Sequence, residues 1–235
     1  MHTKRVDVGE RAREFVGVRG PDAADYLQRM VSNDVEALAV GEACPALLLT
    51  AKARVIAPLV VWRRGEEDFL VLTEPGLGDR VRDELLRLRF RAKCEIEAEA
   101  HASALVFGGD DGFATDWPGA REVLDSELVP TLDANELELR RIEAGVPRWG
   151  HEIDDKILPA EAGLDATHIS FSKGCYPGQE PIARLHYRGH ANRELRVVEL
   201  DAATEVERVT SEATRADGSR VALAYVRTNA KAASS

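Results

Sequence analysis

The sequence has few cysteines and no long apolar run, and both absences narrow the possible classes of protein. Its three cysteines, Cys44, Cys94 and Cys175, are scattered and form no C-x-x-C pair. They support neither a disulfide framework nor a cysteine-rich zinc site, and they predict a protein of the reducing cytoplasm. No stretch of about 18 apolar residues occurs, so we predict no transmembrane helix. The charged residues soon after Met1 likewise predict no signal peptide.

An excess of basic residues is also missing. Lys and Arg number 31 against 41 Asp and Glu, which gives a formal net charge of −10. Such a chain repels phosphate backbones at long range, so we expect neither a direct nucleic-acid partner nor an anionic membrane partner. With 235 residues, 44% of them hydrophobic, the chain can bury a packed core in one large domain or a few small ones.

The hydrophobic pattern predicts an α+β protein, with an antiparallel sheet that carries helices on one face. Helical spacing of apolar residues predicts helices over 21–31, 77–88 and 135–144. The last of these is expected to be capped by Asn135, with Glu138 three residues on. Runs rich in Leu, Val and Ile predict strands at 46–50, 54–62, 69–73, 94–100, 195–200 and 221–226.

The chemistry of the sequence is concentrated in Ser170–Arg184, at the end of a long irregular stretch of the kind that is usually functional. Gly174 and Gly178 permit unusual backbone angles around Cys175, and a proline that suits the first turn of a helix follows. Cys175 would then precede a helix N-terminus, which favours the thiolate, and Lys173 would add to that effect. The segment predicts a reactive or ligand-binding cysteine; a buried structural cysteine is the alternative.

The same region is basic, in contrast to the rest of the chain. Residues 171–196 carry five basic and two acidic side chains, a balance of +3 that leaves −13 for the remainder. This basic island predicts an anionic ligand, and a solvated helix face with (i, i+4) ion pairs is the alternative. His186 and His190 are four residues apart, but no third ligand accompanies them, so we predict no metal site.

The segment Lys173–Glu180, K-G-C-Y-P-G-Q-E, resembles the K-G-C-Y-x-G-Q-E signature of the YgfZ family. Members of that family are folate-binding proteins related to the glycine-cleavage T-protein, an aminomethyltransferase. Motifs within 20–35, 141–154 and 209–224 resemble further patterns of the family, so the similarity covers nearly the whole chain.

The resemblance implies a T-protein-like α+β fold, a ring of three parts around a central folate-binding hole. Residues 1–45 plus 103–190 would form a discontinuous folate-binding domain that carries the signature loop, and residues 46–102 an α+β domain. Residues 191–235 would form a small C-terminal β-barrel with a disordered tail. This barrel is expected to be shortened, because few residues separate Leu200 from Val209.

The resemblance also implies a tetrahydrofolate-binding accessory factor for the assembly or repair of iron–sulfur proteins, with an indirect effect on tRNA thiomodification. Its partners would be iron–sulfur client or assembly proteins. The activity would depend on Cys175, in a transient role, because one cysteine is too few to hold a cluster. The residues expected to contact the folate are Lys173, Tyr176, Gly178, Gln179, Glu180, Arg184 and Arg188.

One departure from the T-protein pattern concerns catalysis. T-proteins carry an aspartate at the position that resembles Pro58, and a proline side chain can neither take a proton nor form a hydrogen bond. Aminomethyl transfer is therefore disfavoured, although a tetrahydrofolate-dependent aminomethyltransferase or demethylase stays the alternative function. A binding module that has lost folate is a third hypothesis.

Overall fold

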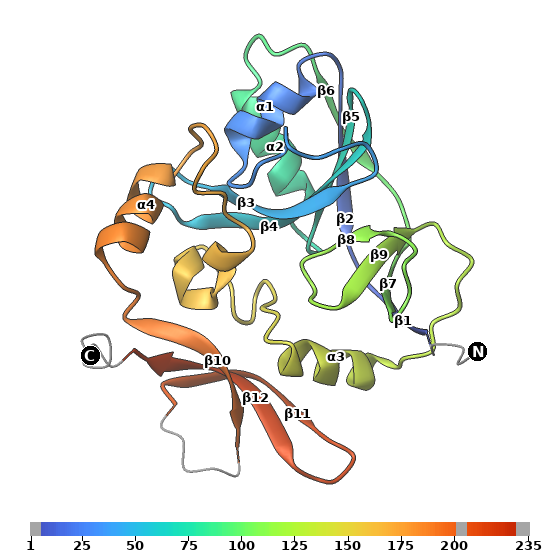
Figure 1. Ribbon diagram of the computed structural model, residues 1–235, viewed down its shortest axis with the longest axis vertical. Helices are drawn as coiled ribbons and strands as arrows, with labels where there is room; N and C mark the ends of the chain where they lie inside the picture. Colours follow the sequence, from blue (N-terminus) through green and yellow to red (C-terminus); the bar gives the residue numbers. More distant parts are fainter. Residues whose placement is uncertain (1–5, 201–205, 229–235) are drawn as a thin grey trace.

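The described part of the chain forms three antiparallel sheets with α-helices packed against them (Figure 1). The structure, a computed structural model, describes residues 6–200 and 206–228. The predicted α+β class is confirmed. The predicted tail falls almost wholly at 229–235, outside the described residues.

The largest sheet has the strand order β3-β4-β5-β2-β6. Helices α1 (Ala23–Met30) and α2 (Gly78–Leu88) cover one of its faces, where their apolar side chains join those of the strands in one buried cluster. The central strands are almost continuous apolar runs because both faces of this sheet are covered. The strands are β2 (Glu14–Arg19), β3 (Ala43–Leu49), β4 (Val55–Gly65), β5 (Asp68–Thr73) and β6 (Glu95–Glu99).

Two smaller sheets complete the fold. The four-stranded sheet has the order β1-β7-β9-β8, and the three-stranded sheet has the order β10-β12-β11, with α3 (Ala134–Glu143) against it. The first comprises β1 (Asp7–Glu10), β7 (Ser103–Phe107), β8 (Phe113–Ala114) and β9 (Ala120–Leu124). The second comprises β10 (Arg193–Glu199), β11 (Arg208–Thr214) and β12 (Arg220–Arg227). In the described residues the C-terminal part is therefore an open sheet and not the closed barrel that we predicted.

The strands of the large sheet come from both sides of residue 46, where we expect a domain boundary, because β2 pairs with both β5 and β6. The division into domains stays a prediction. The expected cap of one helix is wrong. Helix α3 is capped by Asp133, not Asn135: the Asp133 carboxylate accepts hydrogen bonds from the backbone of Asn135 and Glu136, and Glu136 completes a capping box.

The long irregular stretch contains two short 3₁₀ turns, Pro159–Ala162 and Leu164–Ala166, and leads into α4 (Gln179–Arg188). Its apolar residues, among them Ile153, Ile157 and Ile169, pack on the face of the large sheet opposite α1 and α2. Figure 1 shows that α4 lies beside the end of the β3–β4 hairpin, at the edge of the molecule.

Candidate functional site

The signature loop is anchored to the turn between β3 and β4 through Gly178. This glycine has a φ of +83°, and a Cβ atom added to it would lie 2.6 Å from the carbonyl oxygen of Thr50 and 3.1 Å from the Cα of Ala53. Only glycine satisfies both constraints. Gly174 has an ordinary φ and open space around it, so the structure does not require glycine there. Helix α4 begins directly after Gly178, which confirms the predicted loop-to-helix transition.

Lys173 turns away from the loop and fixes it to the end of α1. Its Nζ donates hydrogen bonds to the carbonyl oxygens of Gln28, Val31 and Asn33 at 2.5, 2.7 and 2.8 Å. Burial lowers the pKa of Lys173 to about 8. All three N–H groups are used in these bonds, so its contacts fit a structural role. They do not fit the predicted support of the Cys175 thiolate or a contact with folate.

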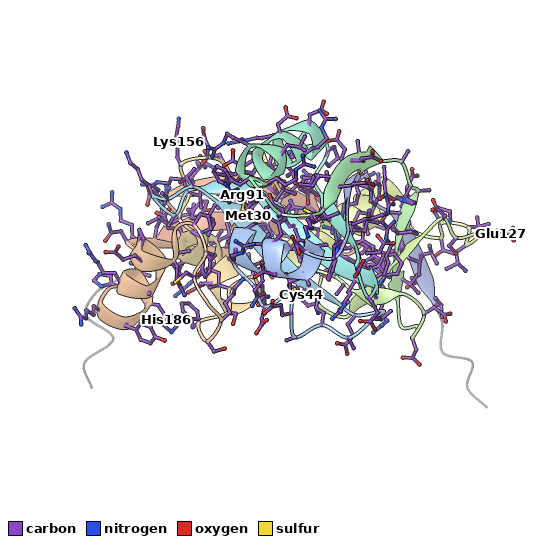
Figure 2. All side chains as sticks on the ribbon, turned by 90° about the horizontal axis from the view of Figure 1, so that it is seen from above. Met30, Cys44, Arg91, Glu127, Lys156 and His186 are labelled. Atoms are coloured by element: carbon purple, nitrogen blue, oxygen red, sulfur yellow. The ribbon has the colours of Figure 1, made fainter. Side chains whose placement is uncertain are left out.

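The other seven predicted site residues line one cavity, which we call the signature cavity, with a volume of about 1090 Å³. They are Cys175, Tyr176, Gly178, Gln179, Glu180, Arg184 and Arg188. The β3–β4 turn, the first 3₁₀ turn and the start of β10 supply further walls. Figure 2 shows α4, with His186 labelled, at the opposite end of the molecule from Glu127.

The three cysteines differ in their accessibility. Cys175 is exposed in the signature cavity. Burial raises the pKa of the Cys44 thiol to about 12 and also raises that of Cys94, so both stay protonated at neutral pH. Among the three, Cys175 alone combines exposure with a position in a cavity, which is what reaction with a ligand or partner requires.

The basic island is largely neutralised by nearby acids. Arg184 forms an exposed ion pair with Glu180 at 3.4 Å, and Arg193 pairs with Glu161 at 2.9 Å. Arg188 is exposed at the cavity, and within residues 6–200 and 206–228 no ion pair is found for it. Arg188 is therefore the cation of this cavity that is free to meet an anionic ligand.

An aromatic cluster beside the cavity was not predicted. The rings of Phe171 and His186 stack with centroids 3.9 Å apart, and Tyr187 meets His186 edge-on at 4.9 Å. Phe171 precedes the signature loop and His186 lies on α4, so only the fold brings these rings together. The spacing of residues along α4 does not predict this contact, because Phe171 lies outside the helix.

A second cavity, which we call the junction cavity, lies where the large sheet, the four-stranded sheet and α3 meet, and has a volume of about 470 Å³. Its walls include Glu74 after β5, Trp117 before β9, and Leu137 on α3. The guanidinium of Arg11 lies 5.7 Å from the Trp117 ring centroid. No local sequence pattern predicts this cavity, because its residues are scattered along the chain.

The family-like stretch 141–154 builds a buried network instead of a ligand site. The Arg141 guanidinium donates to Glu152 at 3.0 Å and to Ser211 on β11 at 2.7 Å. Ser211 in turn donates to Glu152 at 2.6 Å. Burial lowers the pKa of Arg141, but its carboxylate partners Glu138 and Glu152 outweigh burial and raise it. This network joins α3 to the C-terminal sheet.

A second buried ion network lies between β2 and the four-stranded sheet. The Arg13 guanidinium donates to Glu122 and Asp116 at 3.0 Å. Burial opposes the charged form of both acids, but the neighbouring guanidinium groups outweigh it and lower their pKa values. Burial lowers the pKa of the nearby His168 to about 4, so this imidazole is neutral at pH 7.

The sequence analysis expects three features to be absent: a carboxylate at position 58, a metal site and a membrane-spanning helix. Pro58 is buried in β4 opposite Leu47, and its carbonyl accepts a hydrogen bond from Thr73. No carboxylate occupies this position. In the part of the chain that the structure describes, no group of three or more His, Cys, Asp or Glu side chains is placed to hold a metal ion, and no helix is long and apolar enough to cross a membrane.

Comparison with known proteins agrees with this architecture. Residues 11–126 match the family model described as the GCVT N-terminal domain. The solved aminomethyltransferase T of the glycine cleavage system from Bartonella henselae superposes with a TM-score of 0.74 over 95% of this chain and 79% of that chain, at 17% identity. The fold therefore defines the class: a protein with the T-protein fold.

Similarity in sequence points to particular proteins within this class. An uncharacterized protein of Haemophilus influenzae is 27% identical over 83% of this chain and 73% of its own length. The tRNA-modifying protein YgfZ of Serratia proteamaculans is 28% identical over 77% of this chain and 67% of its own. A mitochondrial iron–sulfur cluster assembly factor IBA57 homolog of Pyricularia oryzae is 28% identical over 79% of this chain, which spans 55% of that relative. Together with the family model and the T-protein structure, these relatives support the resemblance to the YgfZ family that the signature segment predicts.

Proposed function

We propose that this protein is a tetrahydrofolate-binding accessory factor for the assembly or repair of iron–sulfur proteins, with an indirect effect on tRNA modification, and that Cys175 is its reactive thiol. The observation that carries the proposal is the signature cavity, where Cys175 is exposed among six other residues of the predicted site. The names of the IBA57 and YgfZ relatives support the same field of activity. The cytoplasmic location stays a prediction, because the fungal relatives are named mitochondrial.

The donor set of the signature cavity fits an anionic ligand with a flat ring. Cavities of roughly 300–1,000 Å³ hold small-molecule ligands, and about 1090 Å³ is available here. Arg188 is free to meet the carboxylates of a folate tail or of a client protein, and apolar side chains such as Ile182 and Leu185 provide walls for a ring. The junction cavity, with Trp117, is the other candidate for the ring.

Cys175 would act on a partner and not as the holder of a resident cluster. A thiolate is a soft ligand for iron and a nucleophile for electrophilic groups. A single exposed cysteine therefore suits a transient contact with a cluster on a client or assembly protein, whose own ligands complete the coordination. Tetrahydrofolate, when bound, would supply a carrier of one-carbon groups or a reduced pterin ring beside this thiol.

Replacement of Cys175 tests the thiol. In cells that lack their own member of the family, we expect the Cys175→Ser variant to fail to restore the activity of a defective iron–sulfur enzyme, whereas Cys44→Ala restores it, because the Cys44 thiol is protonated and half-buried. The measurement is the activity of that enzyme at equal levels of the two variants. Full rescue by Cys175→Ser would remove Cys175 from the proposal.

Titration calorimetry with tetrahydrofolate tests the ligand and locates it. In the signature cavity, Arg188→Ala should weaken binding by about tenfold, since a charge-assisted hydrogen bond contributes roughly 1.5–3 kcal/mol. In the junction cavity, Trp117→Ala should weaken it and Arg188→Ala should not. Absence of any heat or thermal shift with the unaltered protein would favour the module that has lost folate.

A true aminomethyltransferase is the less favoured function. The side chain at position 58 is a buried proline within a paired strand, so it provides no carboxylate for the substrate nitrogen. Detection of folate-dependent methylene transfer from a small amine by the purified protein would reinstate that alternative.

A further inference from the structure

An exposed aromatic side chain, Phe90, lies just after the end of α2. Phe90 is 86% exposed, and its backbone φ is +45°, in the left-handed region. That region is unfavourable for a bulky side chain, and an exposed phenyl ring loses the benefit of burial. Leu86, one turn earlier, is 40% exposed. Such local violations concentrate at functional sites, where the strained conformation serves a role.

This segment is held firmly to the body of the protein. The backbone N–H of Lys93 donates to the Asp22 carboxylate at 2.7 Å, and the Arg89 guanidinium donates to the Cys94 carbonyl at 3.1 Å. A Cβ atom added to Gly20 would lie 2.5 Å from the Lys93 carbonyl oxygen, so the two backbones are in close contact. The backbone that carries Phe90 is therefore anchored, through Lys93, to the turn before α1.

The surroundings of Phe90 are basic, although the protein as a whole is acidic. Residues 86–93, L-R-L-R-F-R-A-K, contain four cations and no acid. Two nearby carboxylates are already engaged: Asp25 pairs with Arg29, and Glu84 pairs with Arg87, each at 2.6 Å. Within the described ranges, no ion pair is found for Arg91 or Lys93, and both are exposed.

A hollow of about 640 Å³ adjoins the ring. It is lined by Tyr26, Arg29, Arg89, Phe90 and Arg91, with Asp22 as its acid. The Asp22 carboxylate already accepts the Lys93 N–H, and the three guanidinium groups outnumber it. The hollow can therefore take a carboxylate-bearing side chain next to the apolar surface of Phe90 and Leu88.

We propose that this surface, Leu86 to Lys93 with the adjoining hollow, is a docking site for an acidic segment of a partner protein. Phe90 would insert into an apolar recess of the partner, and the partner's carboxylates would meet Arg91 and Lys93. Aromatic and arginine side chains are the residues that dominate protein–protein binding energies. The site is separate from the signature cavity, with which it shares no lining residue.

The charge of the whole molecule favours a protein partner over a polyanion. A net charge of −10 repels nucleic acid and anionic lipid at long range. Two unpaired cations form too short a track for a phosphate backbone, whereas they match the few carboxylates of one peptide segment. The apolar face of α2 is packed inside the protein, and Leu86 and Phe90 are the large apolar side chains exposed at its end.

Selection from a random peptide library on the immobilised full-length protein tests the proposal. We expect the enriched peptides to be rich in Asp and Glu and to carry an apolar residue. Synthetic copies should bind in fluorescence anisotropy, and Phe90→Gly and Arg91→Glu should each weaken them by roughly tenfold or more. Val129→Ser and Arg227→Glu, which change an exposed apolar residue and an exposed cation elsewhere, should leave the affinity unchanged.

Phe90→Gly separates binding from folding. Glycine tolerates a φ of +45°, so the melting temperature of this variant should equal or exceed that of the parent while peptide binding is lost. Equal binding by the parent and Phe90→Gly would overturn the proposal, as would enriched peptides without acidic bias. Tighter binding of an oligouridylate or of phosphatidylserine vesicles than of the peptides would overturn the choice of a protein partner.

Discussion

The signature cavity and the Arg141–Glu152 network both come from family-like stretches, yet they differ in burial and bonding. Cys175 and Arg188 are exposed, and among the described residues no side-chain hydrogen bond or ion pair is found for either. The Arg141 and Glu152 side chains are 5% and 0% exposed, and each makes several hydrogen bonds. Both stretches resemble motifs of the family, but their roles differ. The signature loop leaves reactive and charged side chains exposed, whereas the stretch 141–154 fastens the C-terminal sheet to α3.

The same division exists within the signature loop itself. Gly178 and Lys173 position the loop, one by its close approach to the β3–β4 turn and one by three bonds to the end of α1. Cys175 lies between them and takes part in neither contact. Substitutions that remove the supporting residues should therefore cost stability, whereas substitutions of the exposed ones should cost function alone.

The largest effect on stability should come from Glu152→Ala. This change leaves the Arg141 guanidinium buried without its carboxylate, and loss of one partner of a buried pair costs roughly 3–5 kcal/mol. The matched control is Glu180→Ala, which removes an exposed carboxylate of the signature cavity and should cost less than about 0.5 kcal/mol. Urea unfolding measures both. Similar losses for the two variants would break the contrast between the regions.

Acid should destabilise the protein through His168. Its pKa is about 4 in the folded protein because of burial, against an ordinary 6.5, so between these pH values the unfolded chain binds the extra proton. The free energy of unfolding should fall as the pH drops from about 6.5 to 4, by up to about 3 kcal/mol. His168→Asn should flatten this slope in urea unfolding measured across that range. An unchanged slope would contradict the assignment.

His101 should act with the opposite sign. Burial lowers its pKa, but hydrogen bonds with Asp125 and Glu99 outweigh burial and raise it. Its contribution is therefore present below the unfolded pKa and lost as the pH rises through the folded one. Removal of His101 in the His168→Asn background should therefore lower stability at mildly acidic pH, which separates the two histidines.

A smaller loss is expected for Gly178→Ala, with Gly174→Ala as its matched control. The first forces a Cβ atom to 2.6 Å from the Thr50 carbonyl oxygen at a φ of +83°, whereas the second meets nothing within 4 Å. We expect a loss of roughly 1–3 kcal/mol for Gly178→Ala and little change for Gly174→Ala. Urea unfolding of both variants tests whether the loop depends on this one anchor.

The smallest effect on stability should belong to Cys175→Ser. The thiol is exposed, so the free energy of unfolding should change by less than about 0.5 kcal/mol. Rescue of the iron–sulfur enzyme should nevertheless be lost with this variant. A large destabilisation would instead place Cys175 among the supporting residues and would favour the structural alternative.

Local sequence signals predicted much of the fold. The strands at 54–62 and 69–73 and the helices around 23–30 and 78–88 follow from apolar runs and helical spacing, which depend on neighbours in the chain. Strand β2 was missed although it is apolar, and its pairing with both β5 and β6 is a long-range contact. The cap of α3 was misplaced by two residues because Asp133 and Asn135 are both good caps.

The sequence by itself determined the α+β class, the family resemblance and the loop-to-helix segment around Cys175, because these features depend on patterns of contiguous residues. Tertiary structure alone decided that Lys173 bonds to the end of α1, that Phe171 meets His186, and that Phe90 is left exposed beside unpaired cations. The physical reason is that a side chain's partner and burial depend on which distant segments pack against it, and no local pattern encodes that packing.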